Sequence, residues 1–239
     1  MKAICKSFWQ MLSFVKRDMM LFAACAAPVL AGIIIRLGVP LLEDKLAKWL
    51  ELPRILTPFY GLFDLFYAMI APTMFCFVTA MVMLEEHDDR IDEYLIVTGL
   101  GKSGYLASRV FLPAAIAFVV TLVLLPLFHL TELTVLETLF LSLTGTLQGS
   151  IIELLLVTLS SNKLEGMAIT KMATMMILGA FLPYFMSHPI QYVASILPSF
   201  WAAKAIYEQN VLFMLPAVGT AGVWIGCLLM IHATHPHQK

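Results

Sequence analysis

The stretch FYGLFDLFYAMIAPTMFCFVTAMVML, from Phe59 to Leu84, decides the class of fold to which this chain belongs. Among its 26 residues Asp64 alone is charged. A helix needs about 20 apolar residues to cross the hydrocarbon core of a bilayer. Only helices and closed barrels satisfy their backbone groups in lipid, and the stretch lacks the two-residue alternation of a barrel strand. It therefore predicts a transmembrane helix.

Five further apolar stretches lie on either side of it. Together, the six predicted spans are residues 19–42, 59–84, 110–128, 138–159, 172–186 and 211–231. The composition agrees, because 60% of the residues are hydrophobic and 13% are charged, whereas soluble domains carry about a quarter charged residues. We therefore expect an all-α membrane protein with six transmembrane helices, which form a single domain over residues 1–239.

The first 18 residues, MKAICKSFWQMLSFVKRD, are amphipathic and differ from the six apolar stretches. The apolar residues that recur at spacings of three and four are Ile4, Phe8, Met11, Leu12 and Val15. This pattern is typical of a helix that lies in the membrane surface, and we expect one here, with Trp9 and the lysines at the level of the lipid headgroups. A plain extension of the first span is the alternative.

Lys and Arg are unevenly divided between the two sides of the membrane. With the N-terminus in the cytoplasm, ten of the 15 basic residues lie in cytoplasmic segments and five in outer segments. Cytoplasmic segments of membrane proteins carry the excess of Lys and Arg. We therefore predict a multi-pass protein of the inner (cytoplasmic) cell membrane with both termini in the cytoplasm.

The charged segment between the second and third predicted spans, EEHDDRIDEYLIVTGLGKSGYLASR (residues 85–109), holds nine of the charged residues of the chain. Within it, apolar and polar residues spaced three and four apart would share one face of a short helix. They are Ile91, Tyr94, Leu95 and Thr98. A short amphipathic helix in a cytoplasmic loop can dock into a groove of a partner protein and move the attached spans. A charged loop that only fixes the topology is the alternative, and the residues alone do not separate the two.

The residues that follow predict a turn toward the bilayer. Gly99 and Gly101 are expected to end the short helix, as glycines do at helix ends. Lys102 and Arg109 would then lie among the lipid headgroups.

The tripeptide Gly101-Lys102-Ser103 matches the end of the phosphate-binding loop of ATPases. That loop also needs a glycine five residues before Gly101, where this chain has Ile96, and it should follow a buried strand of a soluble sheet domain. The flanking apolar stretches are too long for such a domain. We therefore predict no nucleotide site in this chain.

Other sites are not favoured by the sequence either. The net charge is −1 and no basic run occurs, so we predict no nucleic-acid binding. The four cysteines form no CxxC pair, and His232, His235 and His237 are expected to lie in a solvated tail. We therefore predict no metal site.

Three segments carry a resemblance to a known family. Residues 85–109 resemble the first cytoplasmic loop of the type-2 exporter permeases of ABC transporters. SSNKLEGMAITK, residues 160–171, resembles the second cytoplasmic loop of that family, and ILPSFWAAKAI, residues 196–206, resembles its outer hairpin, which we expect over residues 187–210. The glycines at 99 and 101 stand where the family often has a proline, which leaves the form of that turn open.

The resemblance implies a function and partners. The chain would be the transmembrane subunit of an ATP-driven exporter, paired with a second copy or a paralogue. Separate ABC ATPase subunits would bind ATP and Mg²⁺, so this chain would have no cofactor, no catalytic residue and no enzyme activity of its own. The second and fifth spans would line the route of a small amphipathic cargo, drug-like or lipid-like, for which their Phe and Met side chains are suited.

The resemblance also assigns docking residues. In the first loop, Ile91, Glu93, Tyr94, Leu95 and Thr98 would contact the ATPase. In the second loop, a smaller contact would be made by Asn162, Glu165 and Gly166.

Two other classes of function remain as alternatives. One is an ion-driven carrier that needs no ATPase, although no span is a clearly broken, charge-bearing helix pair. The other is an intramembrane protease, because EEHDDR, residues 85–90, spells Glu-Glu-x-x-x-Arg and a glutamate can act as a general base. The further histidine motifs that such proteases carry are absent from the sequence.

Ionisable residues within the spans are candidates for function, because they are costly in lipid. We expect Asp64 either to face the transport pathway, where it would meet a cationic group of the cargo or line a gate, or to lie near water at the interface. Glu153 is expected to make an interhelical hydrogen bond rather than to bind cargo. Arg36 is expected at the outer end of the first span, beside lipid headgroups.

Overall fold

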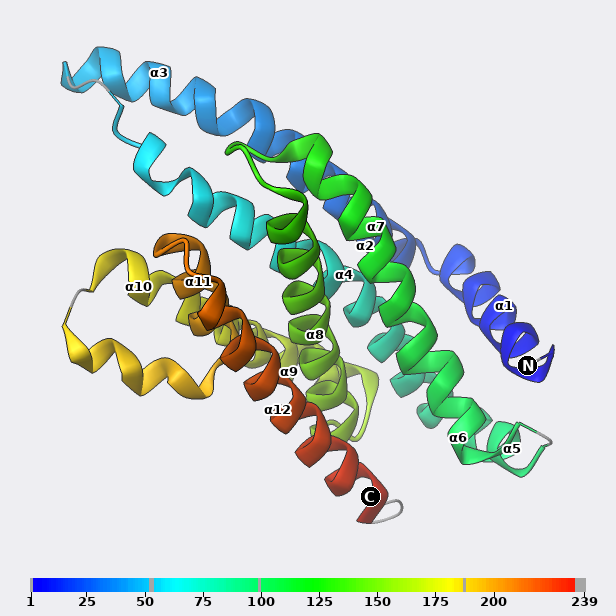
Figure 1. Ribbon diagram of the computed structural model, residues 1–239. Helices are drawn as coiled ribbons and strands as arrows, with labels where there is room; N and C mark the ends of the chain where they lie inside the picture. Colours follow the sequence, from blue (N-terminus) through cyan, green and yellow to red (C-terminus); the bar gives the residue numbers. More distant parts are fainter. Residues whose placement is uncertain (1, 52–53, 99, 187, 235–239) are drawn as a thin grey trace.

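The computed structural model describes residues 2–51, 54–98, 100–186 and 188–234. Within these ranges every regular element is a helix, and six helical units are long and apolar enough to cross a membrane. The predicted fold class is therefore confirmed. Figure 1 shows these helices as an elongated bundle.

The chain starts with α1 (Lys2–Arg17), and six spanning units follow it. They are α2 (Met19–Ile33) with the π-helical turn η1 (Ile34–Gly38) and α3 (Val39–Leu50); α4 (Tyr60–Asp88), preceded by η2 (Thr57–Phe59); α6 (Gly101–Leu106) with η3 (Ala107–Phe111) and α7 (Leu112–Phe128); α8 (Val135–Leu159); α9 (Lys163–Thr174) with η4 (Met175–Phe181) and α10 (Leu182–Phe185); and η6 (Val211–Phe213) with α12 (Met214–Thr234). Three shorter helices connect them, namely α5 (Ile91–Val97), η5 (Pro189–Ile196) and α11 (Pro198–Tyr207).

The core of the bundle is the pair α4 and α8. Of the apolar stretch of each helix, 72% is buried in α4 and 78% in α8, against 17% in the first and in the sixth spanning unit. The two helices approach closely at Gly145, where a Cβ atom would overlap the carbonyl oxygen of Ala68. Small residues let helix backbones approach in membranes, where van der Waals packing drives association. The sequence of α8 therefore places glycine where α4 leaves no room for a side chain.

Several spanning units are longer than the sequence predicted. The first continues past residue 42 to Leu50, the third begins at Gly101 rather than 110, and the fifth begins at Lys163 rather than 172. Each added segment carries charged residues, so hydropathy alone does not count it as part of a span. The helical backbone nevertheless continues through it. The first unit of 32 residues is about 48 Å long at 1.5 Å per residue, more than the ~30 Å hydrocarbon core.

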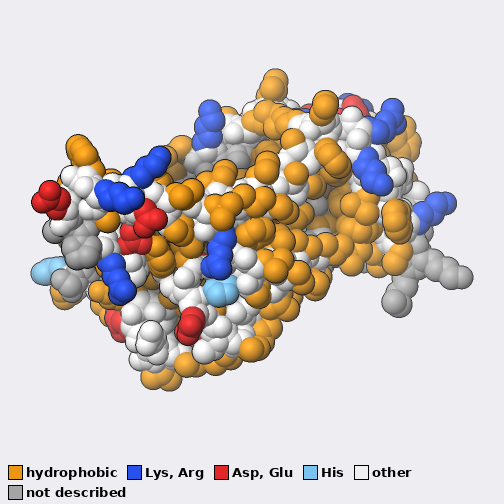
Figure 2. Space-filling model, turned by 90° about the horizontal axis from the view of Figure 1, so that it is seen from above, with side chains coloured by type: hydrophobic (Ala, Val, Ile, Leu, Met, Phe, Trp, Pro, Cys, Tyr) orange, Lys and Arg blue, Asp and Glu red, His pale blue; other side chains and the backbone are white. Residues whose placement is uncertain are grey.

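The two ends of the bundle carry different elements. The N-terminal helix, α5, α6 and the end of α12 lie at one end, and α3, α10 and α11 lie at the other (Figure 1). We call the first of these the coupling end. A broad apolar surface separates two ends at which most charged side chains gather (Figure 2). This pattern is the one expected of a multi-pass membrane protein.

Helix α1 forms as predicted, but its apolar face does not point only toward lipid. Met11 and Val15 are buried in the main hydrophobic cluster, beside α2 and α4, and Ser7 on the same face is buried as well. Trp9 is 65% exposed, and its place at the headgroup level stays a prediction. The amphipathic pattern therefore served mainly to pack α1 against the other helices.

The segment expected as an outer hairpin consists of the 3-10 helix η5 and α11, and Ser187 lies outside the described residues. Lys204 is its buried cation. Its Nζ lies 4.1 Å from the centroid of the Tyr192 ring and 3.4 Å from a carboxylate oxygen of Glu208. A cation over an aromatic face is stabilised by the ring quadrupole, so these contacts hold the hairpin closed.

Candidate functional site

The short helix α5 stands at the coupling end, between the second and third spanning units. Arg90 enters it in the left-handed region, with φ of 57°, which turns the chain sharply after α4. Asp92 and Glu93 occupy the first turn, where acidic side chains favour the positive end of the helix dipole. The helix ends because Thr98 is extended and its hydroxyl donates to the carbonyl of Leu95 at 2.6 Å.

The turn after α5 differs in part from the prediction. Gly101 has φ of +67°, a conformation that glycine adopts without strain, and it therefore makes the turn into α6 as expected. Gly99 lies outside the described residues. The helix itself stops at Thr98, before either glycine, because the threonine side chain competes for the last backbone carbonyls.

The predicted docking face of α5 is divided in the structure. Leu95 packs inward against a second hydrophobic cluster, together with Ile96. Tyr94 is 72% exposed and Val97 is 82% exposed. The sequence missed Val97, although its spacing of three from Tyr94 places the two on one helix face. The exposed apolar surface of α5 therefore consists of Tyr94 and Val97, beside the exposed Glu93.

A buried ion pair joins the end of α4 to η3, close to α5 in the sequence. Arg109 donates from Nε and Nη2 to the two carboxylate oxygens of Glu86, at 2.9 and 2.6 Å. Tyr105 donates its hydroxyl to the same carboxylate at 3.1 Å. Arg109 also donates to the carbonyl and the hydroxyl of Ser7 in α1, both at 3.0 Å. The prediction that Arg109 lies among lipid headgroups is wrong, because it is fully buried; Lys102 is exposed.

A second set of contacts joins the loop before α9 to helices at the same end of the bundle. Lys163, the first residue of α9, contacts carboxylates of Asp18 at 3.0 Å and Glu85 at 2.6 Å. Its backbone N–H donates to Asp88 at 3.1 Å. The Lys163 ammonium lowers the pKa of the Asp18 carboxyl below its usual value. These contacts connect the α1–α2 junction, the end of α4 and the start of α9.

The three residues predicted to dock through the second loop are placed differently from one another. Asn162 and Glu165 are exposed, and the Asn162 side chain caps α9 by accepting from the Glu165 N–H at 2.9 Å. Gly166 is buried, and a Cβ atom there would overlap the side chain of Leu84, so it faces α4 rather than a partner. Leu164, which the sequence did not single out, is 80% exposed. The outward apolar residue of this loop is therefore Leu164.

A stripe of large apolar side chains runs along the half-buried face of α4. Its members recur at three and four and are Phe63, Phe66, Ile70, Met74 and Phe77. Rings of the fifth spanning unit continue this surface, because Phe66 lies 4.7 Å from Phe181 and Phe59 lies 5.3 Å from Phe185 between ring centroids. We call this surface the aromatic face. The second and fifth spans, for which the resemblance implied a shared route, are therefore neighbours with a common aromatic surface.

Asp64 does not belong to the aromatic face. It is 1% exposed and accepts three hydrogen bonds from the segment after α7. The donors are the Leu130 N–H at 2.7 Å and the N–H and hydroxyl of Thr131 at 2.9 and 2.5 Å. These contacts anchor the α7–α8 connection, so Asp64 is neither near water nor open to cargo in this conformation. A role in a pathway stays a prediction.

The two other ionisable residues of the spans have specific partners. Glu153 accepts from the hydroxyl of Thr79 at 2.5 Å across the α4–α8 pair, which confirms the predicted interhelical hydrogen bond. Arg36 is exposed in η1 and donates to the carbonyl of His129, which links the first span to the end of α7.

The glutamates of the Glu-Glu-x-x-x-Arg motif are both engaged. Glu85 pairs with Lys163, and Glu86 pairs with Arg109. Arg90 turns the backbone instead of facing a pocket. Among the described residues, no group of three His, Cys, Asp or Glu side chains is arranged to hold a metal ion. Both glutamates therefore take part in the ion pairs that join the helices at this end.

Comparison with known proteins identifies a family for the chain. A family model described as "Fluoroquinolones export permease protein Rv2686c-like" matches residues 11–233. The match covers all six spanning units and both loops of the coupling end. No curated protein and no solved structure matches the chain. The matched family is of the ABC-2 permease type, so the resemblance read from the sequence is confirmed.

Proposed function

The chain belongs to this family of ABC-2 type export permeases, and we propose that it is the transmembrane subunit of an ATP-driven exporter whose ATPase is a separate protein. A permease of this family is a transport subunit rather than a catalytic one. ATP and Mg²⁺ would bind on the ATPase subunits. The observation that carries the proposal is the exposed apolar surface of α5, a helix that Leu95 and Ile96 hold against the bundle.

The docking proposal follows from the contrast between the two faces of α5. Leu95 and Ile96 pack the helix against the hydrophobic cluster of the bundle. Tyr94 and Val97 lie on its exposed face, where they form an apolar surface that could enter a groove of a partner. Movement of α5 would reach the end of α4 through the contact between His87 and Asp92 at 2.8 Å, and it would reach the bundle through the packing of Leu95 and Ile96. Leu164 would make the smaller contact at the second loop, with Asn162 and Glu165 around it.

We propose that the cargo is a small, amphipathic, drug-like molecule with a planar aromatic ring system. The matched family is named for fluoroquinolones, which are of this kind. The aromatic face would stack such rings, because aromatic pairs prefer offset or edge-to-face contacts. Met74 adds a flexible side chain that adapts to different shapes.

A second permease, either another copy or a paralogue, would complete the pathway. The α4 side chains of the aromatic face are only half-buried in one chain. One chain would therefore form one wall of the pathway, and a second permease would supply the other. The coupling end would face the cytoplasm, since the ATPase and ATP are there and since α1 carries basic residues at both ends. Both termini would then be cytoplasmic in the inner cell membrane.

Affinity purification from the native host in mild detergent, with identification of the co-purifying proteins, tests the docking proposal. We expect an ABC ATPase to co-purify with the parent chain and to be lost with Tyr94→Ala and with Val97→Asp. Trp49→Ala is the matched control, because Trp49 is 81% exposed on α3 at the opposite end. Absence of any ATPase from the parent sample would overturn the proposal and favour an ion-driven carrier.

Efflux of a fluorescent fluoroquinolone from cells tests the cargo proposal. Phe66→Ala is expected to raise drug accumulation, whereas Phe22→Ala, a 59% exposed position on α2 away from the aromatic face, is expected to leave it unchanged. Equal accumulation in cells with and without the parent chain would show that the drug is not a cargo.

A further inference from the structure

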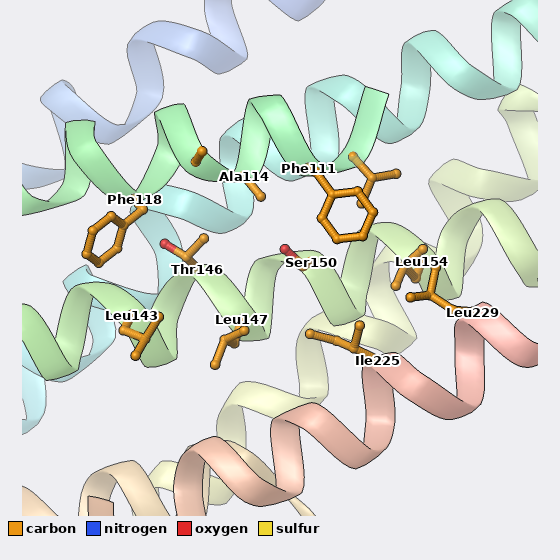
Figure 3. Close-up of a pocket in the computed structure, with 12 residues that line it drawn as sticks. Phe111, Ala114, Phe118, Leu143, Thr146, Leu147, Ser150, Leu154, Ile225 and Leu229 are labelled. Atoms are coloured by element: carbon orange, nitrogen blue, oxygen red, sulfur yellow. The ribbon is translucent and has the colours of Figure 1, made fainter. Parts of the chain in front are cut away.

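A groove lies between α7, α8 and α12, on a side of the bundle that the proposed function does not use (Figure 3). It has a volume of about 270 Å³. The side chains that point into it come from all three helices and include Phe111, Phe118, Leu147, Ser150, Ile225 and Leu229. Phe111 is 57% exposed and Leu143 is 40% exposed, so the groove opens to the surface of the spanning region.

The lining of the groove suits a hydrocarbon chain. Its surface is apolar, although Thr146 and Ser150 contribute hydroxyls. The Thr146 hydroxyl is already satisfied, because it donates to the carbonyl of Ser142 at 2.7 Å. From Val110 in η3 to Phe118 in α7 the groove follows nine residues, about 12 Å of helix. An elongated apolar slot in this position is suited to a lipid tail.

A cationic group stands toward the coupling end of the same groove. Lys102 is exposed on α6, the helix that leads into α7. His232 lies in the last turn of α12, one turn after the groove residue Leu229, and it is within electrostatic range of Lys102. Lys102 therefore precedes the groove on the helix that leads into α7, and His232 follows the groove in α12.

We propose that this groove binds one anionic phospholipid of the membrane, with an acyl chain along Phe111, Leu147 and Ile225 and the phosphate beside Lys102. The charge decides the class of lipid, because a lysine near a membrane surface favours anionic headgroups by about 1 kcal/mol. The site is separate from the aromatic face and from the docking surface.

The position of the groove suggests what the lipid would do. Val110 belongs to the hydrophobic cluster against which Leu95 and Ile96 of α5 pack, and the groove residues Leu147, Ile225 and Leu229 pack against the same cluster. A lipid tail in the groove would therefore stabilise the packing beneath the docking helix. This last step rests on the proposed function, whereas lipid binding itself needs no ATPase.

Native mass spectrometry of the full chain in detergent tests the site. The probes are phosphatidylglycerol and phosphatidylcholine with identical acyl chains. We expect phosphatidylglycerol to bind about fivefold more tightly, the ratio that corresponds to one lysine near a headgroup. Lys102→Gln should remove this preference, and Lys171→Gln, an exposed lysine of α9, should keep it.

Filling the groove gives the second arm. Ala114→Phe, which places a ring in the groove, should abolish binding of both lipids, whereas Val119→Phe on the exposed face of α7 should not. Equal binding of the two lipids, or an unchanged preference in Lys102→Gln, overturns the proposal. Displacement of the lipid by a fluoroquinolone would also overturn it and assign the groove to cargo. Lys102 is exposed, so Lys102→Gln is expected to fold. It therefore tests the proposal even if Ala114→Phe does not fold.

Discussion

The α4–α8 pair and the helix α5 place large apolar side chains in opposite situations. In the pair, side chains such as Leu65 and Ile152 are fully buried against the other helix. In α5, Tyr94 and Val97 point away from the bundle. The first region explains how the chain folds, and the second presents a surface that the chain itself does not cover. A third region, the network of Glu86 and Arg109, joins the end of α4 to η3, α6 and α1, and it can be tested separately.

The largest effect on stability is expected at this link. Arg109→Ala leaves the buried Glu86 carboxylate without its cation, and loss of one partner of a buried ion pair costs roughly 3–5 kcal/mol. Unfolding in detergent should show this loss. The double variant Glu86→Leu/Arg109→Met should recover most of the stability, because it removes both buried charges. Equal stability of Arg109→Ala and the parent would contradict the buried network.

The next largest effect is expected within the helix pair. Gly145→Ala forces a methyl group against the Ala68 carbonyl, and overpacking of this kind costs about 1–3 kcal/mol. Gly219→Ala is the matched control, because a Cβ atom there meets nothing within 4 Å. Thermal unfolding should separate the two variants, and equal midpoints would mean that α4 and α8 do not pack this closely.

A smaller effect is expected from the polar contact across the pair. Thr79→Val removes the hydrogen bond to Glu153 and should cost about 0.6 kcal/mol, the average for interhelical hydrogen bonds in a membrane protein. Thr170→Val, whose hydroxyl bonds only to its own helix, is the control. A loss several times larger in Thr79→Val would show that Glu153 is essential to the packing.

The smallest effect on stability is expected at α5. Tyr94→Ala and Val97→Asp alter exposed side chains, and surface substitutions away from special features usually change stability by less than about 0.5 kcal/mol. The same variants should nevertheless abolish transport. Thermal unfolding and drug efflux, measured on the same preparations, sharpen the comparison between the regions. A large loss of stability would mean that α5 is part of the core.

The sequence predicted the spans and their order because hydropathy is a local property. It also located the helix 91–97 from the spacing of Ile91 and Tyr94. It did not predict the burial of Arg109, whose partners Glu86 and Ser7 lie 23 and 102 residues away. Nor did it predict the hydrogen bonds to Asp64, since their donors follow it by 66 and 67 residues. Contacts of this kind depend on how distant helices pack together, and a local sequence pattern does not predict that packing.

The docking surface illustrates a different limit. Four spacings of three and four suggested one face for Ile91, Tyr94, Leu95 and Thr98, but α5 uses part of that face to pack against the bundle. A helix of seven residues has few positions, and only the structure tells which of them turn outward. Once Tyr94 is known to be exposed, the spacing of three residues predicts that Val97 is exposed on the same face.

Site-specific cross-linking at α5 tests the central claim most directly. Val97→Cys, introduced with Cys5→Ser and Cys227→Ser to remove the exposed native thiols, would be labelled with a short photo-crosslinker in native membranes. Trp49→Cys in the same background is the control. The account predicts an adduct with an ABC ATPase from position 97 and none from position 49. No adduct at 97, with the variant present in the membrane, would contradict the docking role of α5.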